Sequence, residues 1–576
     1  MFKTLHLRGF RYHMNIQLDW YAFSMTSAIL LGSIIVGLSL YSALFHVISH
    51  FSPVKPTTLF RSFERNCRSP LKYAIPLLLL KFGLTFFNAP SAVISFLDHA
   101  FHILFIAVLS WVIIRLVPVA EDVVLRLPLG IIWLVSLCIC GGCATLPKVS
   151  AIIEETPQNE TLQIASAKRL LSPEQSQAIM QRLKEEVGPT DVLKRQVDVL
   201  ESASGTTLKS GNKVTLLIDG LSTYAAMFKA IADARDHINL ETFIFADDEE
   251  GQRLSDLLLQ KQASGVQVNI IYDSIGSLHT PAAFFERLRK GGIRVVEFNP
   301  ISLMKVQKLT RRDHRKMLIV DGKVVITGGV NISGVYVSGL SGEGKSSIPW
   351  RDTDIQIEGP AVADYQTLFL GTWKEQKGSE LPIADYLPQL RNQGKDLVFV
   401  IDNSPGKQNR LIFISYVSAI IFADKSIHLT NAYFVPDRQT IDALSDAVKR
   451  GVDVKIILPT VTDSSLALYA GHYYYSELLG VGVKLFERRD VLLHAKTGVI
   501  DGVWSTVGSS NIDFWSFLHD DEVNAVILSG EFAAQMEQMF DNDIDKSDQV
   551  KLNEWNQRPL YPRIRELISH LLQHWL

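Results

Sequence analysis

The octapeptide HRKMLIVD at residues 314–321 recurs as HAKTGVID at residues 494–501. In each copy a glycine follows the histidine by 14 positions and an asparagine follows it by 17, giving Gly328 and Asn331, then Gly508 and Asn511. A single His-x-Lys-x4-Asp sequence is weak evidence of a function, because such short patterns also arise by chance. Two copies with matched downstream residues have no reasonable chance origin and indicate a duplicated chemical site.

The sequence that surrounds each motif is also repeated. The segments Ala232–Phe245, Ala263–Ile271 and Gly292–Glu297 resemble Ala423–Phe434, Lys449–Ile457 and Gly482–Glu487. These regions predict strands that alternate with helices of about ten or more residues, a pattern typical of an α/β sheet. We therefore predict a duplicated α/β sandwich with pseudo-two-fold symmetry, with halves at residues 211–390 and 391–545.

Each motif predicts a strand that presents a histidine and a lysine together. Residues two apart on a strand share a face, so His314 and Lys316 point the same way, as do His494 and Lys496. The apolar residues of each strand face a core. We place both histidines and both lysines in the catalytic set.

An Asp-Gly pair ends each of these strands. Asp321-Gly322 and Asp501-Gly502 predict two-residue hairpin turns. We include Asp321 and Asp501 in the catalytic set, although turn formation is the interpretation that we favour for both. The second strand of each hairpin would bring Asn331 or Asn511 back beside the histidine and lysine.

Across a pseudo-two-fold axis the two copies would form one pocket with two imidazoles, two ammonium groups and two carboxamides. Lysines balance the charge of a phosphodiester and carboxamides donate hydrogen bonds to its oxygens, so we predict that Asn331 and Asn511 bind phosphate. One histidine can attack phosphorus while the other protonates the leaving oxygen. This chemistry requires neither a metal ion nor a cofactor, and we predict none.

A nucleophilic imidazole needs its second ring nitrogen held, usually by a carboxylate. Glu522 lies 28 residues after His494, and aligning the corresponding strand of the first half places Asp354 against Glu522. We predict that these two carboxylates orient the histidines.

Apolar residues make up 47% of the 576 residues and charged residues only 20%, and the apolar excess is concentrated near the N-terminus. A membrane span needs about 20 predominantly apolar residues. We predict three or four transmembrane helices within residues 1–145, drawn from Tyr21–Ser49, Tyr73–Val93, His99–Val119 and Leu127–Ala144. The alternative of a buried helix in a soluble domain applies best to the second stretch, which contains Lys81, Asn88 and Pro90.

The Lys and Arg residues of short loops indicate orientation. Five of them lie in the loop at residues 51–72 and three in the N-terminal arm, so with four spans everything after residue 145 lies outside. With three spans the orientation reverses. The run that ends at Cys143 also resembles a bacterial lipoprotein signal, so lipidation of Cys143 is a second interpretation of this region.

The remaining segments flank the duplicated part. Residues 146–210 are predicted as a linker with a helix that starts near Ser172 and ends at Gly188-Pro189. Residues 546–576 are predicted as an amphipathic tail that lies in a membrane interface or packs on the domain, because Ile564–Leu576 has apolar residues at helical spacing. The formal net charge of −3 argues against a dedicated nucleic-acid binder.

The paired motifs resemble those of the phospholipase D superfamily, whose mark is two His-x-Lys-x4-Asp motifs in one chain. Over about residues 190–576 the sequence more closely resembles bacterial cardiolipin synthases. The shared segments include Trp350-Arg-Asp352, Asn431-Ala-Tyr433-Phe-Val-Pro436, Leu493-His494-Ala-Lys496 and Arg558-Pro-Leu-Tyr-Pro-Arg-Ile-Arg.

The resemblance implies a phospholipase D-like sandwich, a covalent phosphohistidine on His314, and His494 as general acid and then base. It implies a phosphatidyltransferase of the bacterial inner membrane that joins two phosphatidylglycerols into cardiolipin and glycerol. The loop charges, with four spans, place its catalytic part on the outer face. The alternatives are a phospholipase D that releases phosphatidic acid, a nuclease of the same superfamily, and a non-catalytic membrane scaffold. Asp520-Asp521 replaces the usual Leu-Asn before Glu522, which puts the acceptor pocket in doubt.

Overall fold

The computed structural model describes residues 31–43, 67–79, single positions between 101 and 115, and residues 145–576 except 158–161, 168, 302–309, 339–347, 407–409 and 576. The chain divides into two compact units, Met1–Cys143 and Ala144–Leu576.

In the first unit, residues 31–43 and 67–79 form helices. The two helices approach closely, since a Cβ added at Gly37 would lie 2.5 Å from the Cα of Pro76. Among the described residues, no helix has the length and apolar character that a bilayer crossing requires. Most of the four stretches predicted as transmembrane helices, and Cys143 with its predicted lipidation, lie outside the described residues.

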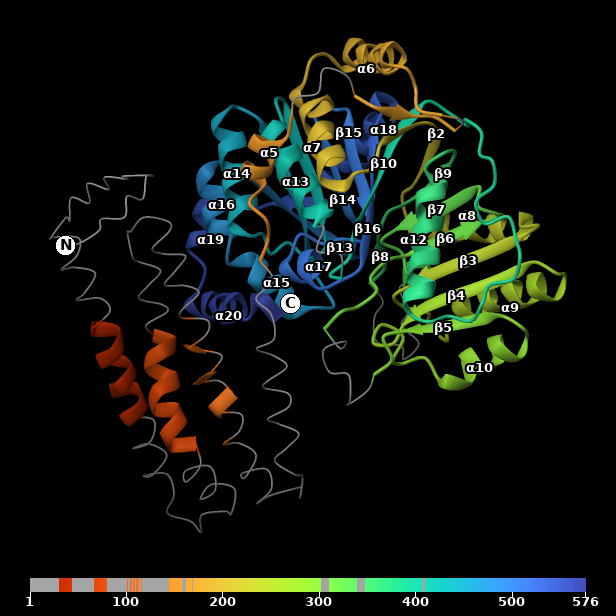
Figure 1. Cartoon of the computed structure of the whole chain (residues 1–576). Helices are drawn as coiled ribbons and strands as arrows, with labels where there is room; N and C mark the ends of the chain where they lie inside the picture. The colour runs from red at the N-terminus through yellow and green to blue at the C-terminus, as the bar shows by residue number, and fades with distance from the viewer. Residues whose placement is uncertain are drawn as a thin grey trace, which may run out of the picture. The chain divides into compact units, whose positions relative to one another are not determined.

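The second unit has the predicted mixed α/β character, and its first half is built on one sheet (Figure 1). The strands pair in the order β5 (Arg294–Phe298), β4 (Gln267–Asp273), β3 (His237–Thr242), β6 (Met317–Val320), β7 (Val324–Gly328), β9 (Asp354–Glu358) and β2 (Leu208–Leu217). The pairs β5–β4 and β4–β3 are parallel and the others antiparallel.

The second half repeats this order of pairing and direction. Its strands are β13 (Lys484–Leu493), β12 (Asp453–Val461), β11 (Ser426–Asn431), β14 (Lys496–Ile500), β15 (Trp504–Gly508), β16 (Glu522–Leu528) and β10 (Asp396–Asn403). Strands β10 and β2 pair antiparallel and so join the two halves edge to edge.

Helices cover the outer faces of the sheets, and two more helices lie between the halves. The outer helices of the first half, α8 (Gly220–Asp233) and α9 (Glu249–Ala263), begin at Asp219 and Asp248, whose carboxylates accept backbone N–H bonds of the first turn. Helices α12 (Val362–Glu375) and α18 (Gly530–Ile544) share a central core with strands of both halves. The histidine motifs therefore sit on strands that one core holds in register.

The segment predicted as a linker packs on the second half. It contains α5 (Val149–Glu155), α6 (Pro173–Val187) and α7 (Arg195–Ser204), and apolar residues of all three join the core of that half. Helix α6 begins at Ser172 in a capping box with Gln175 and ends at Gly188, where the sequence predicted these boundaries. The predicted domain boundaries themselves stay predictions.

The two motif hairpins turn at their Asp-Gly pairs, as predicted, but the pairs Val320–Val324 and Ile500–Trp504 leave residues 321–323 and 501–503 in the loops, one residue more than predicted. Asp321 and Gly322 have φ of 50° and 60°, and Asp501 and Gly502 have φ of 56° and 66°. Positive φ at both central residues is the requirement of a type I′ turn, which glycine and aspartate tolerate better than most residues. In the first turn Lys323 N donates to Val320 O at 2.9 Å.

The aspartate of each turn also binds the start of the neighbouring strand. The carboxylate of Asp501 accepts hydrogen bonds from the backbone N–H groups of Asp424, Lys425 and Ser426 at 2.7–3.0 Å, and from the Thr190 hydroxyl. Asp321 accepts from three consecutive N–H groups, those of residues 235–237, at 2.8–3.1 Å. Asp321 therefore holds its hairpin to the start of β3, and Asp501 holds its hairpin to the start of β11.

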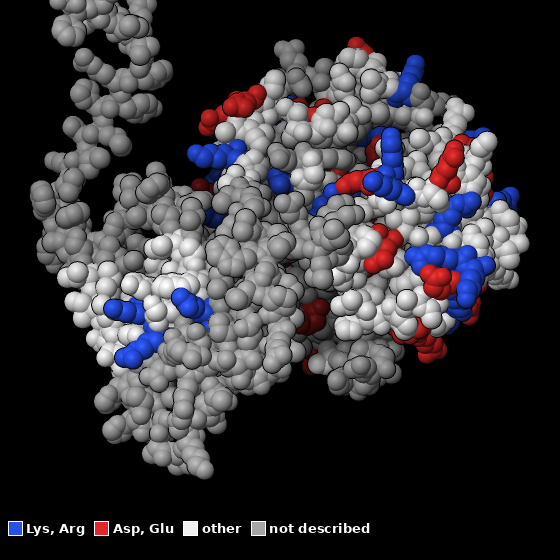
Figure 2. All heavy atoms as spheres, turned by 60° about the horizontal axis from the view of Figure 1, so that its bottom comes forward, with Lys and Arg blue, Asp and Glu red and all other residues white. Residues whose placement is uncertain are grey.

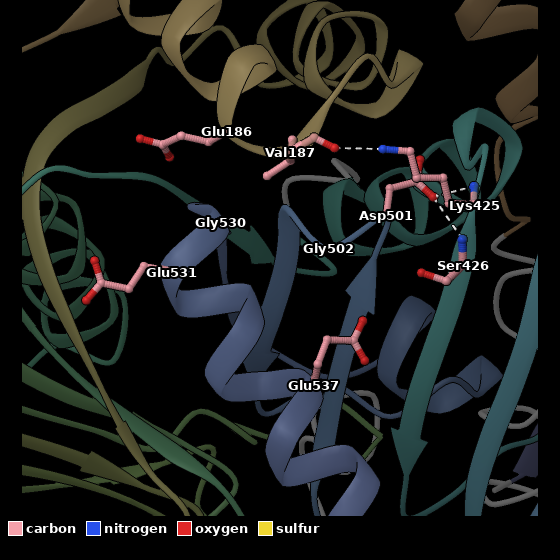
Figure 3. A pocket seen from close by; sticks show the side chains of 9 residues that line it. All are labelled: Glu186, Val187, Lys425, Ser426, Asp501, Gly502, Gly530, Glu531 and Glu537. Atoms are coloured by element: carbon pink, nitrogen blue, oxygen red, sulfur yellow. Dashed lines mark hydrogen bonds between the residues drawn. The ribbon is translucent and has the colours of Figure 1, made fainter.

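Figure 3 shows the surroundings of Asp501, where Lys425 Nζ donates to Val187 O at 2.7 Å. A surface hollow of about 520 Å³ lies here, and its lining includes Glu186, Glu531 and Glu537. It is at the turn end of β14, whereas His494 precedes that strand. The hollow is therefore separate from the histidine pair.

We expect Asp501→Ala to lower the free energy of unfolding by about 3 kcal/mol, because it leaves three backbone N–H groups without their acceptor. The measurement is the midpoint of urea unfolding of the full-length protein in detergent, followed by intrinsic fluorescence.

Asp446→Ala is the matched control. Asp446 is exposed and its carboxylate pairs with Lys449 of the same helix at 2.8 Å. Its loss should change stability by less than about 0.5 kcal/mol. Equal midpoints for the two variants would contradict the anchoring role of Asp501.

Candidate active site

The backbone brings each motif histidine against the other half of the molecule. His314 N donates to Asp521 O at 2.9 Å, and Asp521 N donates to Arg312 O at 2.8 Å. At the second motif, His494 N donates to Arg351 O at 2.8 Å, and β8 (Trp350–Arg351) pairs in parallel with the end of β13. Two equivalent crossings therefore place both histidines at the junction of the halves.

The histidine side chains follow the same crossing. His314 Nδ1 lies 3.0 and 3.1 Å from the two carboxylate oxygens of Glu522 in the second half. His494 Nδ1 lies 2.6 Å from Asp352 Oδ2 in the first half. An ionised carboxylate only accepts hydrogen bonds, so both Nδ1 atoms carry a hydrogen and both Nε2 atoms are left for a ligand.

This arrangement corrects the prediction that Asp354 orients a histidine. Asp354 Oδ1 instead accepts a hydrogen bond from Val330 N at 3.0 Å. In the strand registers Asp354 faces Gly328 and Asn524 faces Gly508, so Asn524 corresponds to Asp354 and Asp352 corresponds to Glu522. The predicted alignment was wrong by two residues, a shift that keeps a side chain on the same face of a strand.

Both motif lysines are buried beside their histidines. Lys316 Nζ donates to His314 O at 2.6 Å, and Lys496 Nζ donates to His494 O. Burial lowers the pKa of Lys316 to about 7, and it also lowers the pKa of Lys496. A bound anion would favour the charged form of both ammonium groups, which makes the pocket suited to a phosphate.

The histidines are held in their neutral form. Burial is the main reason why the pKa of His314 falls to about 4, and the Glu522 carboxylate only partly opposes it. Burial and then the Lys496 charge lower the pKa of His494. Burial alone would raise the pKa of Glu522, but the His314 imidazole and Lys316 hold it below its ordinary value. A neutral imidazole has the free electron pair that nucleophilic attack requires.

The two asparagines differ in their surroundings. Asn331 Oδ1 accepts from Ile244 N at 3.1 Å and its Nδ2 donates to Tyr336 Oη at 2.9 Å, while Tyr336 Oη is 3.5 Å from His494 Nδ1. Asn511 is also buried. Phosphate binding by Asn331 and Asn511 stays a prediction.

Asp321 and Asp501 lie away from the histidines. They follow β6 and β14, whereas the histidines precede these strands, so on the order of 15 Å of strand separates the two ends. Their carboxylates are occupied by the backbone of the neighbouring strand. This corrects their inclusion in the catalytic set and agrees with turn formation.

One buried cation of the site was not predicted from the sequence. Arg315, between the first histidine and lysine, is 3% exposed. Its guanidinium donates to Thr372 Oγ1 at 3.0 Å and to Ser404 Oγ at 2.8 Å, and it lies 3.6 Å from carboxylates of Asp402 and Asp521. It ties the first motif to the second half. The second motif has Ala495 there, so this asymmetry between the copies was the available signal.

One group among the described residues has a metal-ligand arrangement. Single ligand atoms of His314, Asp520 and Glu522 lie within 4.8 Å of one another. Burial, followed by the Glu522 and Asp513 charges, raises the pKa of Asp520 well above its ordinary value, which disfavours the ionised carboxylate that a metal ion binds. That the reaction needs no metal stays a prediction.

A family model described as "Cardiolipin synthase, PLD-like domain" matches residues 227–339 and 416–544. The cardiolipin synthase of Geobacillus kaustophilus is 34% identical over 364 residues, which are 63% of this chain and 72% of the relative. That of Listeria monocytogenes is 35% identical over 371 residues, or 64% of this chain and 76% of the relative. A solved phosphatidylserine synthase of Haemophilus influenzae is 15% identical, with a TM-score of 0.49, over 63% of this chain and 95% of that one.

The two segments matched by the family model contain His314 and His494, so the match includes both halves of the crossed site. The similarity to the curated relatives extends over more than two thirds of their length. By these matches the chain belongs to the cardiolipin synthase family of phospholipase D-like proteins.

Proposed function

We propose that this chain is a phosphatidyltransferase that joins two phosphatidylglycerol molecules into cardiolipin and glycerol. The observation that carries the proposal is the crossed pair of buried imidazoles, in which Nδ1 of His314 and of His494 contacts a carboxylate of the opposite half. Two buried lysines beside them supply the charge that a phosphodiester requires. The family supports the substrate class.

In the first step, the Nε2 atom of neutral His314 attacks the phosphorus of one phosphatidylglycerol. The bond from phosphorus to the glycerol oxygen breaks, and protonated His494 gives its proton to that oxygen. The products are glycerol and a phosphatidyl group on His314. His494 acquires the necessary proton when the anionic substrate binds, because a nearby negative charge raises the pKa of an imidazole.

In the second step, the free hydroxyl group of another phosphatidylglycerol attacks the same phosphorus. His494 takes the hydroxyl proton as general base, the phosphorus–nitrogen bond breaks, and His314 leaves as a neutral imidazole. Cardiolipin is released and both histidines return to their starting protonation states. If water attacks instead, the product is phosphatidic acid.

The repeated strand order supports a duplicated phospholipase D-like sandwich with pseudo-two-fold symmetry. In this arrangement β6 and β14 present His314 and His494 to one phosphate from opposite sides. In-line displacement at phosphorus needs the nucleophile and the leaving oxygen on opposite sides, and a two-fold site supplies one histidine for each.

We also propose that the three or four predicted transmembrane helices anchor the enzyme in the bacterial inner membrane, with the catalytic unit on the outer face. The proposed partners are phospholipid and membrane, and no nucleic acid. On the right-hand part of Figure 2, basic and acidic side chains are interspersed. A nucleic-acid binder is instead expected to show a basic stripe or patch.

The proposal is tested with the full-length protein in detergent and phosphatidylglycerol as the lipid. We expect cardiolipin and glycerol in equal amounts, and we expect His314→Ala and His494→Ala to lower turnover by at least about 10³-fold. Phosphatidic acid without cardiolipin would identify a hydrolase, and the absence of both lipids would contradict an enzyme of either type.

His428→Ala is the matched control for these variants. His428 also has a carboxylate partner, because its Nδ1 lies 2.6 Å from Glu537 Oε2, but it lies on β11 away from the crossed site. Turnover by the His428→Ala variant should stay within about threefold of that of the unmodified enzyme. A loss as large as that of His494→Ala would show that the assay reports folding.

The pH profile gives a second test. Because the pKa of Lys316 is lowered to about 7, the free enzyme loses this positive charge above that pH, and it must also take up a proton at neutral His494, so kcat/KM should fall on the alkaline side. It should also fall near pH 4, where His314 gains a proton and cannot attack. Bound substrate favours the charged lysine, so the alkaline fall of kcat should lie at higher pH than that of kcat/KM. A flat kcat/KM from pH 6 to 9 would contradict the role of Lys316.

The assignment of Asp352 to His494 and of Glu522 to His314 can be tested with a phosphatidyl ester of p-nitrophenol. This leaving group departs as an anion, so cleavage no longer needs a general acid. We expect Asp352→Asn to lower cardiolipin formation by about 10- to 100-fold, but its single-turnover release of p-nitrophenolate from this ester should be largely restored, as that of His494→Ala should be, because His494 is then needed only as base in the second step. Glu522→Gln should lower cardiolipin formation by a similar factor. Its release of p-nitrophenolate should not be restored, because Glu522 orients the nucleophile His314. Rescue of Glu522→Gln instead of Asp352→Asn would refute the crossed assignment.

A further inference from the structure

The helix near the C-terminus leaves an apolar face uncovered. Helix α20 (Leu560–Leu571) packs against α15 (Ser465–His472) and buries Glu566 and Ser569 on that side (Figure 1). Four apolar side chains of α20 face away from the protein, with exposed fractions of 70% for Leu560, 68% for Tyr561, 45% for Ile564 and 52% for Ile568. With Leu466 of α15, which is 37% exposed, they form what we call the α15–α20 surface.

The charge on this surface is positive. Arg563 and Arg565 are exposed on α20, and in the described part of the chain neither forms an ion pair. The one carboxylate of the helix, Glu566, points inward and pairs with Arg558 at 2.6 Å. The Arg565 guanidinium lies 4.4 Å from the ring centre of Tyr469 on α15. Apolar side chains with interspersed arginines complement the acyl chains and headgroups of an anionic lipid layer.

The α15–α20 surface begins close to His494. The Tyr433 ring centre is 6.3 Å from that of His494, and the Tyr433 hydroxyl donates to Asp463. Asp463 lies two residues before α15, whose first residue is Ser465. A lipid layer on this surface would therefore lie next to the pocket that receives the headgroup.

The surface also lies near the point where the chain enters the catalytic unit. Val149 N donates to the side chain of Gln439, on α14 (Arg438–Lys449), at 3.0 Å. The neighbouring Arg438 pairs at 2.6 Å with Glu477 of α16 (Tyr475–Val481). Just before α16, Tyr474 bonds through its hydroxyl to Gln573, two residues after α20. The start of the catalytic unit at Val149 and the α15–α20 surface therefore lie toward the same end of this unit.

We propose that the α15–α20 surface docks on an anionic phospholipid bilayer and holds the opening of the active site against the leaflet that contains the substrate. The inference rests on the proposed function for the identity of the lipid. The occupant is the headgroup and upper acyl region of a leaflet that contains phosphatidylglycerol. Ile564 and Ile568 enter the interface, and Arg563 and Arg565 meet lipid phosphates.

The contact is tested by photo-crosslinking without reference to activity. A benzoylphenylalanine is placed at Tyr561 of the full-length protein, reconstituted in vesicles of phosphatidylcholine with or without 30% phosphatidylglycerol. We expect a crosslink to lipid whose yield rises at least about threefold with phosphatidylglycerol and falls at 1 M salt, where charges are screened. The same group at Ile383, which is fully exposed on another loop, should give no lipid crosslink.

The functional consequence is read as a ratio of two rates. Turnover of phosphatidylglycerol in vesicles is divided by turnover of a short-chain phosphatidylglycerol below its critical micelle concentration. The double variant Ile564→Asp, Ile568→Asp should lower this ratio by about tenfold, because charged side chains oppose burial of this face. Ile383→Asp should leave it unchanged. An equal loss of both rates would indicate a folding defect. In that case the crosslinking experiment decides whether the surface contacts lipid.

Several outcomes would overturn the proposal. A crosslink to residues 1–143 of the same chain would show that the membrane region covers this face, and a crosslink to a second copy would show a dimer interface. Equal crosslinking to neutral and anionic vesicles would refute the choice of lipid. A lipid crosslink from a protein that makes no cardiolipin would leave the docking intact and refute the proposed function instead.

Discussion

Two histidine–carboxylate contacts that cross between the halves are the constraint on which the rest of the structure depends. His314 needs Glu522 and His494 needs Asp352, so neither half contains a complete acid–base unit. The contacts are short and buried, and a buried imidazole without its partner would lose both its orientation and its tautomer. The two sheets must therefore be held in one fixed relation.

The fold supplies that relation at two levels. Strands β2 and β10 join the sheets at their edges, and α12 and α18 fill a core to which both halves contribute. Close to the site, the backbone bonds from His314 to Asp521 and from His494 to Arg351 fix each motif against the strand that carries the opposite carboxylate. The Asp501 and Asp321 anchors act at the far ends of the hairpins, so each hairpin is held at both ends.

Local features of the site could be read from the sequence, and features that join distant segments could not. The positions of the Asp-Gly turns and the cap of α6 depend on residues within a few positions of one another. The crossing depends on contacts between residues 142 and 208 positions apart, for which the alternation of strand residues carries no information. A shift from Asp352 to Asp354 keeps the same face of the strand, so the pattern alone could not separate them. The tail was predicted to pack or to face a membrane, and the structure shows that α20 has one packed side and one exposed side.

The pseudo-symmetry of the site is incomplete in a way that limits exchange between the halves. A Cβ on Gly329 would lie 2.1 Å from Asp352 Oδ1, whereas the equivalent Ser509 donates a hydrogen bond to Glu522. A chimera that repeated either half twice would pair the wrong carboxylate with each imidazole environment. The two halves, although similar in strand order, are therefore not interchangeable: each carboxylate is matched to its neighbour in its own half, Gly329 or Ser509, and to a histidine in the other half.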